Sequence, residues 1–441
     1  MNPAIKKTCK VALTVLAAAV IGGCVYLDGL MPIITGYAAK NLASAVFVSG
    51  RDPAEVGDLD LNFSFIAFTR NRVDYQNRIV TSRFLWGKST AVFREGYGVT
   101  LLRGKKVDEL KADAFPLPPE TEIPDTARSS DRALISKLEP IAKTFVDDRS
   151  YGGTPFAFVV MHDGEVVAER YKEGITAEMP LLSWSMAKSF TNALAGVMAG
   201  DLLVDIHAPM DIPEWRNDGR KAITLDDLMR MRSGLRWNEN YGNRSDVNLM
   251  LHREKDMGLF ALSKPLEHEP GTFWYYSSGS TNIVMRYLRG KFLSDSEFLA
   301  YIRDRLFAPL GVRNAYFEPD MSGTPVGSSY IYVTAREFAR FGQMYLDDGL
   351  VGGVRVLPEG WVEYTVTPTE ASDGRYGSFF WLNLNRSKPD APEDMFSCNG
   401  HDGQEIYIIP SKRLVVAVLG YSPSSDRIDF NALLRDIIKE L

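Results

Sequence analysis

Ser185 and Lys188, three residues apart, stand at the start of a stretch with helical spacing, and no other serine in the chain has a lysine at this distance. At a helix start, free N–H groups and the helix dipole favour a developing negative charge. The i+3 spacing places Lys188 on the same face as Ser185, where burial and neighbouring charge can lower the lysine pKa enough for it to accept a proton. The pair suits nucleophilic catalysis, although an N-cap serine before a surface lysine gives the same pattern.

Two further motifs follow in the chain. Tyr276-Ser277-Ser278 comes six residues after Pro270, and His401-Asp402-Gly403-Gln404 leads directly into a strand-like run. In order and spacing, Ser185-x-x-Lys188, Tyr276-Ser-Ser and His401-x-Gly403 resemble the three motifs of the serine β-lactamase and penicillin-binding protein superfamily. The resemblance runs from about residue 130 to residue 441 and is nearest to class C β-lactamases, DD-peptidases, β-lactamase-fold esterases and nylon-oligomer hydrolases.

The resemblance implies a covalent mechanism. The Ser185 hydroxyl would attack a carbonyl, and Lys188 and the Tyr276 phenol would share its proton, because an unactivated hydroxyl is a poor nucleophile. We also expect the Lys188 charge to lower the pKa of Tyr276. The backbone N–H groups of Ser185 and Gln404 would form the oxyanion hole, and Gly403 would let the substrate lie close to that backbone.

Two positions depart from the family pattern. The tyrosine motif often ends in Asn, where this chain has Ser278, and the third motif often begins with Lys, where this chain has His401. A histidine is charged only part of the time at neutral pH, so His401 would hold a substrate carboxylate weakly. We therefore expect a serine hydrolase that cleaves an ester, amide or peptide of small-molecule size in preference to penicillins.

Two other functions stay open at this stage. The first is a DD-peptidase or a class C-like β-lactamase with the same covalent mechanism. The second is a catalytically silent envelope protein that keeps the fold to bind a partner.

Composition excludes several classes of protein. The formal charge of −6 is spread along 441 residues without a basic stripe, which argues against nucleic-acid binding. Five scattered histidines and three cysteines form no zinc-ligand pattern, so we expect no metal and no cofactor.

The elements around the motifs predict an α+β fold. It is β-lactamase/transpeptidase-like, with one antiparallel sheet flanked by helices and a helical insertion domain. Strands are expected in a hairpin over Phe156–Tyr171 and at Glu405–Ile409 and Leu414–Leu419. Helices are expected at Arg132–Val146, from Ser185 to Ala199, and at Asp426–Leu441.

The first 120 residues lie outside the resemblance. We expect a helix near Gly36–Phe47, β-structure over Phe63–Leu102 with its clearest strand at Ile79–Trp86, and a proline-rich linker at Phe115–Pro119. The predicted domains are a signal segment at 1–27, an N-terminal extension at 28–120 and the hydrolase domain at 121–441.

The signal segment predicts membrane attachment. Lys6, Lys7 and Lys10 precede the uncharged run Val11–Leu27, which predicts a cytoplasmic N-terminus and a body on the periplasmic, extracytoplasmic face of a bacterial inner membrane. The 17-residue run is on the border between a secretory segment and a spanning anchor. Ile21-Gly22-Gly23-Cys24 also resembles a lipobox, so lipid attachment at Cys24 and simple secretion are the alternatives to an uncleaved anchor. The sequence leaves the oligomeric state open.

Overall fold

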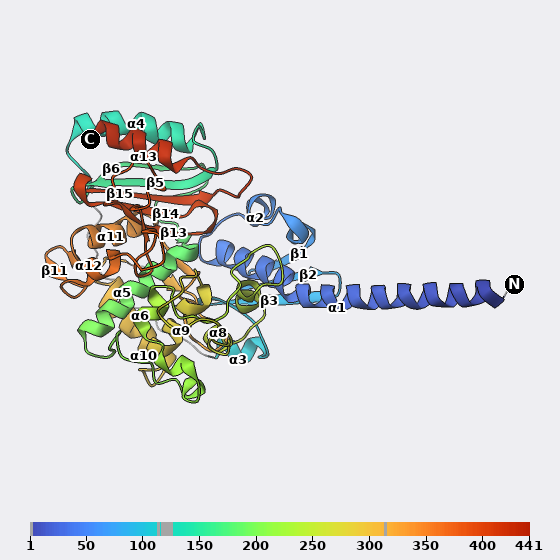
Figure 1. Cartoon of the computed structure of the whole chain (residues 1–441). Helices are drawn as coiled ribbons and strands as arrows, with labels where there is room; N and C mark the ends of the chain where they lie inside the picture. Colours follow the sequence, from blue (N-terminus) through green and yellow to red (C-terminus); the bar gives the residue numbers. More distant parts are fainter. Residues whose placement is uncertain (1–2, 113–114, 116–126, 313–314) are drawn as a thin grey trace.

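A six-stranded antiparallel sheet is the centre of the body formed by residues 127–441, which the sequence predicts to be a hydrolase (Figure 1). The computed structural model describes residues 3–112, 115, 127–312 and 315–441, without the side chains of residues 3–9 and 11. In spatial order the strands are β12 (Trp381–Leu382), β13 (Phe396–Asn399), β14 (Glu405–Ile409), β15 (Leu414–Tyr421), β5 (Thr154–His162) and β6 (Glu165–Tyr171). The hairpin and the two C-terminal strands predicted from the sequence are all in this sheet.

Both faces of this sheet are buried, because apolar side chains alternate between them. Along β5, Phe158 and Val160 face one helical layer, whereas Val159 and Met161 face the other. The first layer is formed by α4 (Arg132–Val146) and α13 (Phe430–Glu440). The second contains α11 (Ala335–Leu346), on which α5 (Ala187–Gly200) packs through stacked Phe190 and Phe341 rings 3.7 Å apart.

Short helices and turns fill most of the chain between α5 and α11. The helices are α6 (Leu225–Met229), α7 (Asp246–His252), α8 (Met257–Leu262), α9 (Ser278–Arg289) and α10 (Asp295–Ile302). Two smaller sheets lie outside the main sheet. One has three strands, β7 (Leu181–Leu182), β9 (Ile331–Val333) and β8 (Tyr316–Phe317), and the other is the hairpin of β10 (Leu350–Val351) and β11 (Val354–Arg355). The hairpin is followed by α12 (Trp361–Val366). The short 3₁₀-helices of this part are η2 (Trp184–Met186), η3 (Pro213–Trp215), η4 (Gly219–Ala222), η6 (His401–Gly403) and η7 (Pro410–Lys412), and η5 (Arg303–Phe307) is a π-helical turn. This arrangement confirms the predicted α+β fold with a helical insertion.

The N-terminal part consists of one long helix and a four-stranded sheet. The helix α1 (Pro3–Phe47) runs without a break from the apolar segment into the body, where the sequence suggested a separate helix at Gly36–Phe47. The sheet and its flanking elements are α2 (Pro53–Leu59), η1 (Ser64–Phe68), β1 (Arg70–Asp74), β2 (Ile79–Phe84), β3 (Gly87–Arg94), β4 (Gly98–Leu101) and α3 (Val107–Lys111). The linker predicted at Phe115–Pro119 lies, apart from Phe115, outside the described residues.

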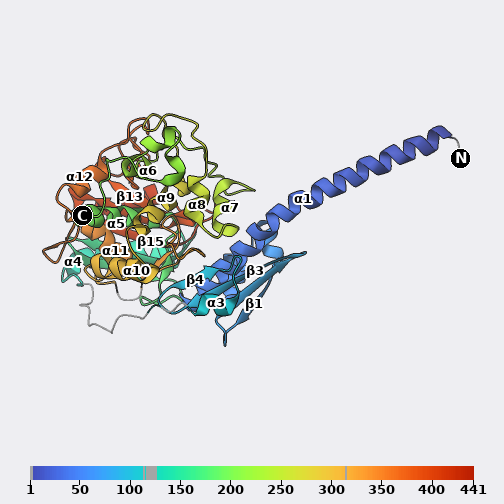
Figure 2. The ribbon, with the colours of Figure 1, turned by 90° about the horizontal axis from the view of Figure 1, so that it is seen from below.

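The two ends of α1 have different surroundings. Residues 12–26 project from the body with exposed side chains, whereas Ile34, Ala38 and Leu42 are buried against the four-stranded sheet (Figures 1 and 2). The same apolar cluster includes Tyr332 of β9, so α1 joins this sheet to the hydrolase body. By length and composition, α1 contains a segment apolar enough to cross a membrane.

Candidate active site

Ser185 lies in η2, the tight turn between β7 and α5. Its neighbour Trp184 has a φ of +42°, a left-handed conformation that is costly for a bulky residue and is found at sites where the surroundings enforce it. Ser183 fixes the turn, because its N–H donates to the Ile331 carbonyl at 2.9 Å. The α-helix begins at Ala187, so Ser185 lies just before it, where the sequence predicted the helix to start at the serine itself.

Lys188 is the direct partner of this serine. Its Nζ lies 2.8 Å from Ser185 Oγ, 3.1 Å from Ser278 Oγ and 3.1 Å from the Ser328 carbonyl oxygen. The side chain is buried, and this burial lowers the pKa of Lys188 to about 8 although the Glu239 charge raises it. The lowered lysine pKa that the sequence suggested is therefore confirmed as an effect of burial, whereas the expectation that a neighbouring charge also lowers it is wrong. Lys188 is suited to accept the serine proton.

Tyr276 lies on the other side of this lysine, with Lys188 Nζ 4.8 Å from the centroid of its ring. Burial raises the pKa of Tyr276 well above its usual value; the Glu239 charge raises it further, and a side-chain hydrogen bond with Ser185 lowers it. The expectation that Lys188 lowers the tyrosine pKa is thus wrong, because desolvation of the phenolate dominates. In the resting site Tyr276 is suited to donate a proton.

Ser278 is connected to a carboxylate that the sequence reading missed. Ser278 Oγ lies 2.5 Å from Glu239 Oε1, and the Ser278 N–H donates to Glu239 Oε2 at 2.9 Å. Because Ser278 is the first residue of α9, this carboxylate also lies at a helix N-terminus, where a negative charge is favourable. Ser278 Oγ accepts from Lys188 and donates to Glu239, so its proton is already engaged and unavailable to a substrate.

Residues 237–241 hold Glu239 in place. Trp237 Nε1 donates to Glu239 Oε2 at 2.5 Å, and the Tyr241 hydroxyl donates to Glu239 Oε1 at 2.9 Å. This loop therefore lies beside the start of α9. No spacing rule links Glu239 to Ser278, since the two residues are 39 positions apart and on different elements.

The third motif lies directly beside the serine turn. A Cβ added at Gly400 would meet the Ser183 carbonyl oxygen at 2.5 Å, and the His401 ring packs edge-on against Trp184 with centroids 5.7 Å apart. Gly403 has a φ of +84°, and an added Cβ would meet Ser422 Cβ at 2.8 Å, so this glycine is required by the turn itself. The structure thus brings Ser185 and the start of β14 together.

Gln404 and His401 differ in how firmly they are held. The Gln404 side chain is buried and exchanges two hydrogen bonds with the Gly420 backbone, of 2.7 and 2.9 Å, which fixes the start of β14. The His401 ring is exposed, stacks on Tyr241 with centroids 5.3 Å apart, and has Nε2 3.4 Å from Asp402 Oδ1. A protonated His401 would therefore have its charge partly offset by Asp402.

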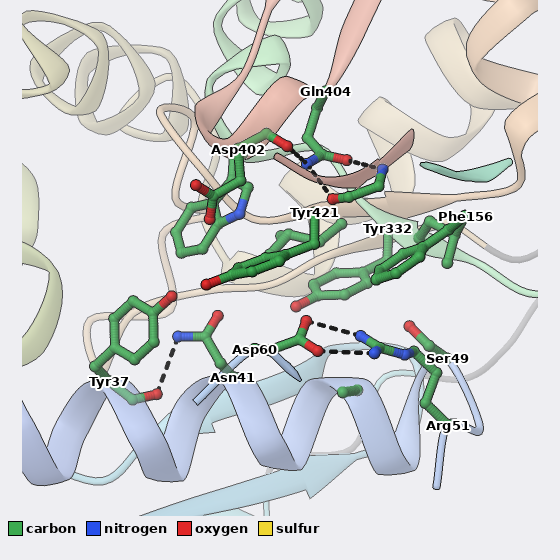
Figure 3. Close-up of a pocket in the computed structure, with 15 residues that line it drawn as sticks. Tyr37, Asn41, Ser49, Arg51, Asp60, Phe156, Tyr332, Asp402, Gln404 and Tyr421 are labelled. Atoms are coloured by element: carbon green, nitrogen blue, oxygen red, sulfur yellow. Dashed lines mark hydrogen bonds and ion pairs between the residues drawn. The ribbon is translucent and has the colours of Figure 1, made fainter. Parts of the chain in front are cut away.

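A small cavity of about 50 Å³ lies behind the serine turn, between α1 and the hydrolase body (Figure 3). Tyr37 and Asn41 of α1 face Asp402 across it, and Trp184 also lines it. The Tyr37 ring is stacked on Trp184 at 6.2 Å, so a side chain of the N-terminal helix supports the residue that precedes Ser185. Among the described residues, no group of His, Cys, Asp and Glu side chains is arranged to hold a metal ion.

Comparison with known proteins agrees with this geometry. The family model described as Beta-lactamase matches residues 141–436. The 6-aminohexanoate-dimer hydrolase of Paenarthrobacter ureafaciens is 23% identical over 310 residues, which cover 65% of this chain and 77% of that protein.

Two solved structures show the same fold. A family VIII carboxylesterase superposes with a TM-score of 0.56 at 16% identity, covering 72% of this chain and 99% of the esterase. A penicillin-binding protein homologue from Caulobacter crescentus gives a TM-score of 0.55 at 14% identity, covering 73% and 100% of the two chains. With the matched family model spanning well over half of its length, the chain belongs to the beta-lactamase family and is a serine hydrolase of that fold.

Proposed function

We propose that this protein hydrolyses an ester or amide bond through an acyl-enzyme on Ser185. Lys188 in its neutral form takes the proton from Ser185 Oγ as that oxygen attacks the substrate carbonyl. The carbonyl oxygen becomes an oxyanion, which the N–H groups of Ser185 and Gln404 stabilise. Tyr276, whose raised pKa keeps it protonated, donates a proton to the leaving group as the bond between the carbonyl carbon and that group breaks, and the proton held by Lys188 then replaces it. In deacylation water attacks the acyl carbon and gives its proton to the neutral Lys188, which returns it to Ser185 Oγ as the acyl group leaves.

One observation carries this proposal. Lys188 Nζ is 2.8 Å from Ser185 Oγ, and burial lowers the pKa of that lysine to about 8. A serine in contact with a base that is partly neutral at physiological pH can be activated, whereas a serine beside a solvated lysine cannot. A catalytically silent binding protein has no chemical need for this buried pair.

The substrate class follows from the second and third motifs. The Ser278 hydroxyl donates its hydrogen bond to Glu239, so it is not a free donor for a penicillin carboxylate. The Asp402 carboxylate lies beside the His401 ring, so His401 does not offer a full positive charge to the penicillin carboxylate. Ester cleavage needs only the nucleophile, its base and the backbone donors. The similarity to a 6-aminohexanoate-dimer hydrolase supports an amide among the substrates.

Labelling with a fluorescent fluorophosphonate tests the nucleophile. The parent protein is expected to label, and Ser185→Ala is expected to abolish labelling while the circular dichroism spectrum stays unchanged. Ser189→Ala is the matched control, because Ser189 is a buried serine in the first turn of α5, four residues after Ser185, and its hydroxyl donates to the Phe379 carbonyl. Full-rate labelling of Ser185→Ala would refute the proposal.

A comparison of kcat/KM for p-nitrophenyl butyrate and nitrocefin on one preparation tests the substrate class. The ester is expected to be turned over far better. A wide margin in favour of nitrocefin would restore the β-lactamase alternative, and labelling by fluorescent penicillin would indicate a DD-peptidase.

We further propose that residues 121–441 form the catalytic domain and residues 28–120 an extension that holds it at the outer face of a bacterial inner membrane. The support is the exposed apolar stretch of α1, from Leu13 to Tyr26, preceded by three lysines. At ~1.5 Å per residue the 17-residue run Val11–Leu27 is ~25 Å long, close to the ~30 Å of a bilayer core. Mass spectrometry of the mature N-terminus distinguishes an uncleaved anchor from a lipid-modified Cys24.

A further inference from the structure

We propose that the β2–β3 hairpin of the N-terminal extension is a membrane-binding foot, which rests on the bilayer surface and contacts anionic lipid headgroups. This rests on the proposed insertion of the apolar part of α1 into the membrane. The foot consists of the hairpin turn Leu85–Trp86 and the three cations Arg70, Arg83 and Lys88. It sets the orientation of the hydrolase body on the membrane.

The hairpin runs beside α1 with its turn toward the apolar segment. Three contacts fix the direction: Trp86 Nε1 donates to Asp28 Oδ1 at 3.1 Å, Gly87 lies against Met31, and the Ser89 and Thr35 hydroxyls are 2.8 Å apart. Moving from β3 toward the turn therefore means moving along α1 toward its N-terminus. Both views show the hairpin pointing in the direction in which α1 leaves the body (Figures 1 and 2).

The turn lies at the level where a bilayer would begin. Asp28 is the first charged residue after the apolar run Val11–Leu27, and it is the residue that Trp86 contacts. A carboxylate at this position stays outside the hydrocarbon core, because burying it there is costly. Trp86 is thus placed at the interface, where tryptophan rings are enriched in membrane proteins.

Large apolar side chains are exposed at this level. Leu85 is 64% exposed and Trp86 is 55% exposed, and both lie in the turn. The Phe65 ring of the preceding turn η1 packs 5.9 Å from Phe84, the last residue of β2, and Phe68 beside it is 69% exposed. Contiguous exposed apolar side chains on a soluble domain mark an interaction surface, and here they surround the base of an apolar helix.

A row of positive charge crosses the sheet next to this apolar turn. Arg70 pairs with Arg83 in the β1–β2 ladder, and Arg83 pairs with Lys88 in the β2–β3 ladder. Directly opposite residues share one face of a sheet, so the three exposed cations are neighbours, a destabilising arrangement unless an anion compensates it. The rung lies one residue pair from Phe84 and Gly87, and rungs are ~3.4 Å apart.

No carboxylate of the described residues forms an ion pair with these three cations. Other charges of the extension do form ion pairs, as in Arg51–Asp60, Arg78–Glu95 and Glu55 with Lys172 of the hydrolase body. A fourth exposed cation, Arg244 of the helical insertion, lies against Gly29 at the same level of α1. Apolar side chains at the turn and unpaired cations one rung above match a bilayer interface whose phosphates are anionic.

Fluorescence of Trp86 in vesicles tests this foot. Trp86 is the one exposed tryptophan; Trp184, Trp215, Trp237 and Trp361 are buried, and Trp274 and Trp381 are half-buried. The full chain is reconstituted into phosphatidylcholine vesicles with 30% phosphatidylglycerol, in which bromine atoms at acyl carbons 6–7 or 11–12 act as quenchers. We expect stronger quenching by the shallow bromines, and loss of most of this quenching in Trp86→Phe.

The outcomes separate the foot from the anchor. A chain that no longer floats with vesicles would overturn membrane attachment, and the foot with it. A chain that floats but is quenched no more than Trp86→Phe would overturn the foot alone, and crosslinking of Lys88 to a second copy would then assign the surface to protein association.

The charges are tested separately with a double variant. Arg83→Ser with Lys88→Ser is expected to remove the increase in shallow quenching that phosphatidylglycerol produces over phosphatidylcholine alone, an increase of about twofold in the parent. Arg132→Ser with Lys137→Ser on α4, far from α1, is the matched control and is expected to behave as the parent (Figures 1 and 2). Equal quenching of the parent in both lipids would overturn the headgroup contact. Turnover of a soluble ester should be unchanged in all these variants.

Discussion

Lys40 on α1 and Lys188 on α5 lie in separate regions of the molecule, yet their surroundings are alike in most respects. Both are buried, at 2% and 1% exposed, and each contacts a serine hydroxyl. Lys40 Nζ lies 4.1 Å from the ring centroid of Tyr330, and Lys188 Nζ lies 4.8 Å from that of Tyr276. The difference is that Lys40 is in direct contact with a carboxylate, Glu318.

This one carboxylate separates a structural lysine from a chemical one. Glu318 also accepts from the Val99 N–H at 2.6 Å, so the Lys40–Glu318 ion pair joins α1 and β4 to the hydrolase body. Burial lowers the pKa of both lysines, but at Lys40 the charge of Glu318 in direct contact opposes this shift. At Lys188 the nearest groups are hydroxyls and a carbonyl, which offset burial less than a carboxylate does, and the lysine pKa falls to about 8. Lys188 can therefore act as a base, because the nearest carboxylate, Glu239, is separated from it by the Ser278 hydroxyl.

Replacing Lys188 by Met should give the largest difference between the two lysines, which is a loss of activity without a loss of stability. We expect kcat/KM for p-nitrophenyl butyrate to fall by about 10³–10⁴-fold, because general-base catalysis is lost and Tyr276, with its raised pKa, cannot substitute. The folded protein should be at least as stable at pH 7, since the variant removes a charge that burial penalises. Lys439→Met, on the surface of α13, is the control. A fall in kcat/KM of less than tenfold would contradict the role of Lys188 as the general base.

Replacing Lys40 by Met should have the opposite pattern. The change leaves Glu318 buried without its partner, and breaking such a pair costs about 3–5 kcal/mol in the free energy of unfolding. Chemical denaturation measures this loss, while kcat/KM of the remaining folded protein should stay within a few-fold of the parent.

A double variant checks the cause. Adding Glu318→Gln to Lys40→Met removes the unpaired charge and keeps an acceptor for the Val99 N–H, so much of the lost stability should return. If the double variant is less stable than Lys40→Met, the pair is not what makes that position sensitive.

The pH dependence of acylation should report the Lys188 pKa. Lys188 works as a base only when it is neutral, so kcat/KM should rise with pH and level off above about 8. Between pH 6 and pH 8 the neutral fraction, and with it kcat/KM, increases about 50-fold. Stopped-flow or steady-state ester assays across this range measure the profile, and a flat profile from pH 6 to pH 9 would contradict the lysine base.

The sequence predicts the hydrolase body well because its signals are local. The helix Arg132–Val146 agrees with the observed α4 residue by residue, and the spacing of Ser185 and Lys188 already brings the two side chains together. The Asp163-Gly164 turn within Phe156–Tyr171 similarly predicted the β5–β6 hairpin.

The contacts that tune the two lysines are long-range, so no spacing rule could find them. Glu318 lies 278 residues from Lys40, and Glu239 reaches Ser278 from an irregular loop. The sequence also placed the Tyr276 pKa on the wrong side of its usual value. The sequence indicates that a lysine charge lies near the phenol, but it does not indicate how deeply the phenol is buried, and burial is the main cause of the raised pKa.

Glu239→Gln should produce the smallest change and the sharpest test of the comparison. The Glu239 charge raises the pKa of Lys188, so its removal should move the rising limb of the kcat/KM profile to lower pH, by a few tenths of a unit to about one unit. Glutamine keeps an acceptor for the Ser278 hydroxyl, so the fold and the acylation plateau should change only a few-fold. Glu393→Gln, an exposed carboxylate paired with Arg386, is the matched control and should leave the profile in place. A limb that stays fixed or moves to higher pH would mean that Glu239 orients Ser278 without acting on the charge of Lys188.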